Sequence, residues 1–133
     1  MEDRFKFRAW WDGSNDCDAR MVGWEEICSE FMPYGEIIPI ERNPGWTLMQ
    51  CTGIRDATRS KEFPNGKLIY EGDIVALGEL NNNLSLVGYV KMSQGCWCIQ
   101  LRDHRTPILS KFICEILGNK YENPELLEQS HGR

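Results

Sequence analysis

The sequence has no long apolar segment and no sign of an export signal. No run of about 20 apolar residues occurs, and a membrane-spanning helix needs about that length. The first residues, from Met1 to Arg8, are mostly charged or aromatic and contain no apolar signal-peptide core. We therefore expect a cytoplasmic protein that does not associate with a membrane.

A disulfide framework is not expected either, although six cysteines occur in 133 residues. Such frameworks belong to exported domains whose hydrophobic cores are small. Because nothing marks this chain for export, we expect reduced thiols that mostly fill the core. The six are Cys17, Cys28, Cys51, Cys96, Cys98 and Cys114.

Basic residues are fewer than acidic residues. The chain has 15 Lys and Arg against 20 Asp and Glu, which gives a net charge of −5 and a pI near 5.1. Non-specific binding to nucleic acid depends on Lys and Arg that displace counterions, and the whole chain lacks that excess. Basic residues still gather at residues 4–8 and 55–67. These two groups are either solvated faces or a local interaction surface.

Groups that could carry out catalysis are few. Only two histidines occur, His104 and His131, and neither lies in a motif that would activate a nucleophile. No glycine-rich phosphate loop is present. Cys96 and Cys98 could join His104 and Cys114 in a zinc site, but structural zinc sites usually separate paired cysteines by two residues or more, so buried core thiols are the alternative we favour. We expect no catalytic residue, no metal and no cofactor.

The residues that are present predict a mainly β fold. The chain is 41% hydrophobic and 26% charged, which is typical of one folded domain, here residues 1–133. Apolar and charged residues alternate from Phe5 to Ala9, as in a half-buried strand. A second strand is predicted at residues 46–52, ended by Gly53. Further strands are predicted at residues 68–70, 73–77, 86–92, 96–101 and 115–119, with hairpin turns at Asn65–Gly66 and Ser93–Gly95.

Two helices complete the prediction. Apolar residues recur with helical spacing from Trp24 to Phe31, and Pro33 ends that pattern. Asn123 and Pro124 have the residue types of an N-cap and a first helical position, so a C-terminal helix should begin there. We expect twisted antiparallel sheets or a partly open barrel, with one short amphipathic helix and one C-terminal helix.

Three ordered blocks of the sequence resemble the YopX family. They are Lys6–Trp10 (KFRAW), Leu48–Gly53 (LMQCTG) continuing to Ile69–Val75 (IYEGDIV), and Leu117–Leu127 (LGNKYENPELL). The resemblance covers nearly the whole chain. Two departures occur: residues 59–64 look like an insertion, and Trp10 is followed by a second tryptophan.

The resemblance implies a small protein encoded by phages and prophages that assembles as a homo-oligomer. It implies no catalytic residues, because none are assigned in that family. We therefore expect a non-enzymatic accessory protein acting through self-association and contacts with phage or host proteins. The alternative is a weak nucleic-acid-binding module that uses the N-terminal strand and residues 54–67.

The candidate residues fall into two groups. Basic and aromatic side chains could form an interaction surface, because aromatics beside Lys and Arg suit both protein interfaces and single-stranded nucleic acid. This group is Lys6, Arg8, Trp10, Trp11, Arg55 and Arg59. The other group comprises turn and cap residues. A tight turn at Gly72 also explains the two acidic residues beside it, Glu71 and Asp73, without a catalytic role. The members of this group are Gly53, Gly66, Gly72, Asp73, Asn123 and Pro124.

Overall fold

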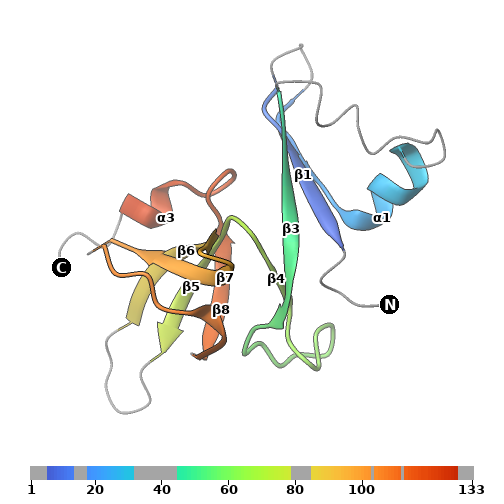
Figure 1. Ribbon diagram of the computed structural model, residues 1–133. Coiled ribbons are helices and arrows are strands. Elements are labelled where there is room, and N and C mark those ends of the chain that lie inside the picture. Colours follow the sequence, from blue (N-terminus) through green and yellow to red (C-terminus); the bar gives the residue numbers. More distant parts are fainter. Residues whose placement is uncertain are drawn as a thin grey trace. The chain divides into compact units, whose positions relative to one another are not determined.

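The computed structural model describes residues 6–13, 18–31, 45–78, 85–102, 104–111 and 113–128. Two antiparallel four-stranded sheets dominate these residues, and the helices are short (Figure 1). The mainly β prediction is confirmed. No helix in these described ranges is long and apolar enough to cross a membrane.

The chain divides into two compact units, residues 1–51 and 52–133, and the boundary falls inside strand β3, Trp46–Arg55. The first sheet has the strand order β2-β1-β3-β4, so β3 carries hydrogen-bonded partners in both units. The second sheet lies wholly in the second unit. That the chain acts as one domain stays a prediction.

The first unit is built on strand β1, Phe7–Trp11, which pairs with β2, Arg20–Val22, and with β3. Side chains alternate between the two faces of β1, and Ala9 therefore points into a small core that it forms with Val22 and Ile27. The predicted amphipathic helix is present. It consists of one α-helical turn, α1 at Trp24–Glu26, followed by a π-helix at Ile27–Phe31.

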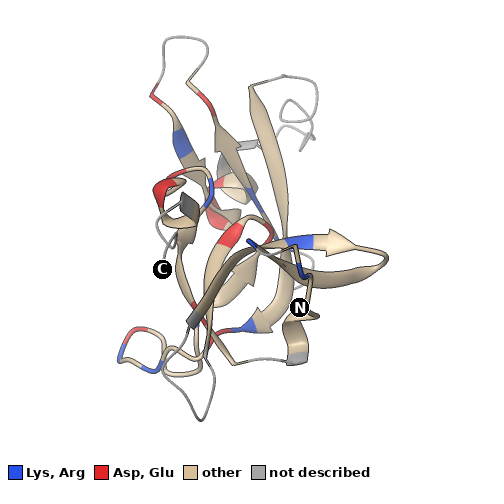
Figure 2. Ribbon diagram, turned by 90° about the vertical axis from the view of Figure 1, so that its left-hand side faces the viewer, with Lys and Arg blue, Asp and Glu red and all other residues tan. Residues whose placement is uncertain are grey.

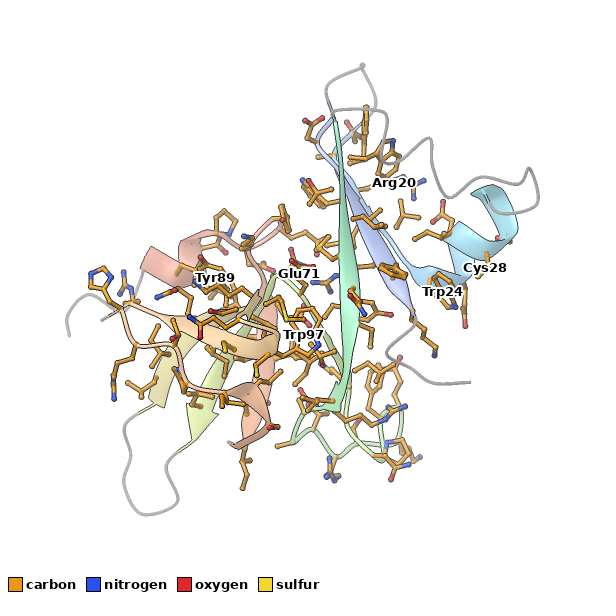
Figure 3. The ribbon with its side chains drawn as sticks, in the orientation of Figure 1. Arg20, Trp24, Cys28, Glu71, Tyr89 and Trp97 are labelled. Atoms are coloured by element: carbon orange, nitrogen blue, oxygen red, sulfur yellow. The ribbon has the colours of Figure 1, made fainter. Side chains whose placement is uncertain are left out.

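Trp24 extends this small core at its edge. Its side chain packs against the buried residues, and its ring centroid lies 6.3 Å from that of Phe7 (Figure 3). Aromatic pairs at this separation add to the stabilisation that burial provides. The contact between Trp24 and Phe7 therefore adds to the core of Ala9, Val22 and Ile27 in holding the helix against strand β1.

The second unit is organised around a sheet of strand order β7-β6-β5-β8. The strands are β5, Asp73–Gly78; β6, Ser85–Ser93; β7, Cys96–Leu101; and β8, Cys114–Asn119. Alternate residues of each strand form one buried cluster, which Ile54 and Trp97 also join. The cluster comprises Ile69, Val75, Leu77, Val90, Ile99, Leu101, Leu109 and Cys114.

Both edges of this second sheet are covered by other parts of the chain. Along β7, the amides of Ile99 and Leu101 donate to the carbonyls of Pro107 and Arg105, at 2.9 and 3.0 Å. Along β8, the amide of Ala57 donates to the carbonyl of Cys114 at 2.8 Å. Covered edges prevent a sheet from pairing with strands of other molecules.

The remaining elements are short. Strand β4, Leu68–Tyr70, ends the first sheet, a 3₁₀-helix spans Leu109–Lys111, and helix α3 spans Glu125–Glu128. The predicted C-terminal helix is confirmed, although it is brief. The irregular connection expected near residues 33–46 lies almost entirely outside the described residues.

Two predictions about turns were wrong. Strand β3 continues through Gly53 to Arg55, because Gly53 adopts a φ of 81° inside the strand, as in a β-bulge. The amide of Gly66 donates to the carbonyl of Phe63, which places Pro64 and Asn65 at the centre of the turn. A type I′ turn at residues 65–66 needs a positive φ at Asn65, and Asn65 does not have one.

The reason is that Pro64 fixes φ near the value that the first central position of an ordinary turn requires. Gly66 then takes the positive φ that follows the turn, at 92°. The second predicted hairpin turn is confirmed between β6 and β7. There Gln94 and Gly95 both have positive φ, at 53° and 83°, which is the signature of a type I′ turn.

Candidate functional site

The side chain of Asp56, which lies directly after strand β3, bonds to three separate parts of the chain. It is 3% exposed, and its carboxylate accepts four hydrogen bonds. Oδ1 accepts from the amides of Thr58 at 3.0 Å and Lys67 at 2.8 Å. Oδ2 accepts from the hydroxyl of Thr58 at 3.0 Å and the amide of Ile116 at 2.9 Å. Asp56 thus joins both ends of the β3–β4 loop to strand β8.

Burial by itself raises the pKa of a carboxyl group, because the charged form loses its hydration. At Asp56 the hydrogen bonds from Ile116, Lys67 and Thr58 outweigh burial and hold the pKa below its usual value. The carboxylate is therefore ionised at neutral pH and serves as a fixed acceptor for backbone amides. It is a structural group with no titration near neutral pH for general acid–base chemistry.

The loop that Asp56 closes is the basic segment noted in the sequence, and we call residues 55–67 the basic hairpin. Arg55 donates Nη1 to the carbonyl of Gly66 at 3.0 Å. Arg59 donates Nη1 to the carbonyls of Asp56 and Thr58 at 3.2 and 2.7 Å. Both candidate arginines therefore help to hold the shape of the hairpin, in addition to carrying its charge (Figure 2).

The N-terminal candidates are divided between two faces of strand β1. Lys6, Arg8 and Trp10 alternate with the residues of the core, and each is partly exposed. Trp11 lies on the opposite face, is 4% exposed, and packs against Trp46 with ring centroids 5.0 Å apart. Trp11 is thus placed in the core. A surface formed by the other three stays a prediction.

Large apolar side chains are exposed on strand β8 and directly before it. Ile113 is 58% exposed and Leu117 is 44% exposed. Glu115 lies between them and is also exposed, whereas Cys114 is buried and Ile116 packs against the core cluster. The period of two along the strand explains this division. The outward side of β8 therefore presents apolar residues to its surroundings.

Comparison with known protein families identifies the family to which the chain belongs. The family model described as YopX protein matches residues 6–128. The chain belongs to the YopX family. No curated protein and no solved structure matches the chain.

Parts of the central and C-terminal YopX blocks form tight turns of the second unit. In the Glu71–Asp73 turn, Gly72 has a φ of 90°, and Asp73 accepts the amide of Tyr70 through Oδ2 at 2.8 Å. The amide of Lys120 donates to the carbonyl of Gly72 at 2.9 Å. The central and C-terminal blocks of this YopX chain therefore meet at one turn.

The C-terminal YopX block is organised by two asparagines. Oδ1 of Asn119 accepts the amides of Tyr121 and Glu122 at 3.0 and 2.9 Å. Oδ1 of Asn123 accepts the amide of Asn119 at 3.2 Å. We expected the Asn123 side chain to cap the following helix, but the structure assigns it to the preceding turn, and its carbonyl accepts the amide of Leu126. Pro124 follows directly before α3.

Metal-binding and nucleophilic groups are dispersed. Within the described ranges, no three His, Cys, Asp or Glu side chains are grouped so as to hold a metal ion. Cys96 is exposed and Cys98 is buried, although they share a face of β7, and His104 is exposed in the following loop. Cys17 lies outside the described residues.

The cysteines should differ sharply in reactivity. Burial, followed by the charges of Asp56 and Asp73, raises the pKa of the Cys114 thiol to about 11. At pH 8 roughly one such thiol in a thousand is ionised, and the thiolate is the reactive form. We expect an alkylating reagent to modify exposed Cys96 within minutes while Cys114 stays unmodified, as measured by mass spectrometry of peptides. Guanidinium-unfolded protein, the control, should be modified at both, and equal rates in the native protein would contradict the buried position of Cys114.

Sequence reasoning missed the central role of Asp56. A signal for it exists: Asp followed two residues later by Thr is typical of a turn in which the carboxylate accepts the nearby amide and hydroxyl. Its bond to Ile116, however, joins residues 60 positions apart. No local pattern contains that contact.

Proposed function

We propose that this YopX protein is a non-enzymatic accessory protein of phages or prophages. It acts in the cytoplasm of the bacterial host through self-association and through contacts with other proteins. The observation that supports this proposal is the outward side of strand β8, where Ile113 and Leu117 are exposed. Exposed apolar residues gathered on one element are typical of interaction surfaces.

The backbone of β8 favours association through side chains. The edge of β8 that does not face β5 already has partners within the chain. The amide of Ala57 donates to the carbonyl of Cys114, and the Asp56 carboxylate accepts the amide of Ile116. A second molecule would therefore meet the outward face of the sheet, where Glu115 of β8 is opposite Ala76 and Ala76 is opposite Val87. Ala76 and Val87 are partly exposed, so apolar residues also lie across the sheet from Glu115.

The test is the oligomeric state of the Leu117→Glu variant. Placing a carboxylate in an apolar contact removes hydrophobic burial and leaves a charge without a partner. We expect the dissociation constant of the oligomer to rise by about tenfold or more, which light scattering across a dilution series would measure.

The matched control is Met92→Glu. Met92 is 45% exposed, slightly more than Leu117, but it lies near the β6–β7 turn. It should leave the oligomer intact. A wild-type protein that stays monomeric at high micromolar concentration would refute self-association, and an equal loss in both variants would refute the assignment to β8.

A further inference from the structure

The basic hairpin, residues 55–67, is a positively charged element in an acidic chain. It contains Arg55, Arg59, Lys61 and Lys67 against two acidic residues, a net charge of +2. Since the whole chain carries −5, the remaining residues together carry −7. One of the two acidic residues, Asp56, is buried and surrounded by hydrogen-bond donors. The charged side chains of the hairpin that face solvent are therefore mostly basic.

The hairpin is also held in one shape by its own hydrogen bonds. Beyond the contacts of Asp56, Arg55 and Arg59, the amide of Ser60 donates to the carbonyl of Phe63 at 3.2 Å. The amide of Phe63 donates in return to the hydroxyl of Ser60 at 3.0 Å. An element ordered before binding loses little conformational entropy when a partner arrives.

An aromatic ring lies among these cations. Phe63 is partly exposed, and the Lys67 ammonium lies 5.5 Å from the centre of its ring. Lys61 is exposed two residues away. A ring beside several cations is the arrangement by which proteins hold single-stranded nucleic acid, with the base on the ring and phosphates on Lys and Arg. We propose that the basic hairpin binds single-stranded nucleic acid.

The aromatic ring favours nucleic acid over an acidic protein segment. An acidic peptide would be attracted by the same four cations, but its carboxylates gain nothing from the face of a phenyl ring. A nucleotide uses both features, since each phosphate is joined to a base that can stack. The acidic remainder of the chain weakens binding only modestly at about 0.1 M salt, where charges are screened over about 10 Å.

The test measures the fluorescence anisotropy of a labelled oligodeoxythymidine titrated with the protein at several salt concentrations. Lys61→Gln should weaken binding about three- to fivefold at 0.1 M salt, and the slope of log K against log salt should become shallower by about 0.7. Phe63→Leu should weaken binding about fivefold or more with the slope unchanged, because stacking displaces no counterions.

The matched control is Lys91→Gln, which removes the same charge from strand β6. It should leave both affinity and slope close to wild type. Three results would overturn the proposal: no binding at low salt, an equal loss with Lys91→Gln, or full competition by polyglutamate at equal charge concentration. The last would assign the hairpin to acidic proteins. The hairpin test is independent of the proposed self-association, since Leu117→Glu should leave oligonucleotide binding to the protomer unchanged.

Discussion

Gly66→Ala is expected to lower the free energy of unfolding by about 4 kcal/mol, from added backbone strain and overpacking. Gly66 has a φ of 92°, a region that L-residues with a side chain rarely adopt. A Cβ at this position would also lie well inside 3.0 Å of the Asp56 carbonyl oxygen, which is backbone and cannot rotate away. Denaturant unfolding followed by tryptophan fluorescence measures the change.

Gly95→Ala separates the two causes. Gly95 has a similar φ of 83°, but a Cβ there would meet no atom within 4 Å. Only the backbone strain then applies, and we expect a loss of about 1 kcal/mol. Equal losses at the two glycines would show that the close approach of Gly66 to Asp56 has no energetic weight.

Asp56→Asn should cost about 3 kcal/mol of stability, although it changes only one atom of the side chain. An amide has one acceptor oxygen and one NH₂ donor, whereas the carboxylate uses both oxygens as acceptors. One orientation brings the NH₂ group against the amide of Ile116, and the other brings it against the amides of Thr58 and Lys67. In either case a buried amide loses its acceptor. The same unfolding measurement detects the loss.

The same group predicts how stability depends on pH. Hydrogen bonds hold the folded pKa of Asp56 below its ordinary value, so the unfolded chain takes up a proton first as the pH falls. Its contribution is fully present above the unfolded pKa of about 4, and it is lost as the pH falls through the lower folded pKa. Between about pH 5 and pH 2, Asp56→Asn should therefore lose less stability than the wild type. An Asp56→Asn curve parallel to that of the wild type over this range would contradict the role of the Asp56 carboxylate.

Glu26 contributes little to this acid dependence. Its hydrogen bond from Arg20 is the main cause of its lowered pKa. The pair is well formed, with Nη1 and Nη2 at 3.1 and 2.8 Å from the two carboxylate oxygens. Both side chains are exposed, however, and exposed ion pairs are screened by water and salt.

The basic hairpin contributes both to the stability of the fold and to the proposed binding function. Asp56, Arg55 and Arg59 hold the segment that presents Lys61 and Phe63. Variants at Gly66 or Asp56 would therefore disturb both folding and binding. Lys61→Gln changes an exposed side chain outside this hydrogen-bond network, which makes it the informative variant for binding.

Much of the architecture followed from local patterns in the sequence. Alternation predicted β1, apolar β-prone residues between turn signals predicted β5, β6 and β7, and the spacing of Trp24 and Ile27 predicted the first helix. These predictions succeed because each depends on neighbouring residues, whose side chains must face one core. Strand β2, Arg20–Val22, was not predicted.

The turns show where local patterns mislead. Asn65–Gly66 has the most favoured composition for a type I′ hairpin, yet Pro64 shifts the turn by one residue. Asn123 has the composition of a helix cap, yet its side chain bonds to Asn119 in the preceding turn. In the first case Pro64 fixes the backbone of the turn, and in the second the amide of Asn119 occupies the side-chain oxygen that would have capped the helix.

The sequence by itself determined the family, the mainly β composition and the residues that make the turns, because these depend on short-range order along the chain. Tertiary structure alone decided which face each candidate residue occupies. It placed Trp11 in a core beside Trp46, joined Asp56 to Ile116, and turned the basic segment into an ordered hairpin. Those outcomes depend on contacts between residues that are distant in the chain. Such contacts are strong because they are buried, and no local pattern in the sequence predicts them.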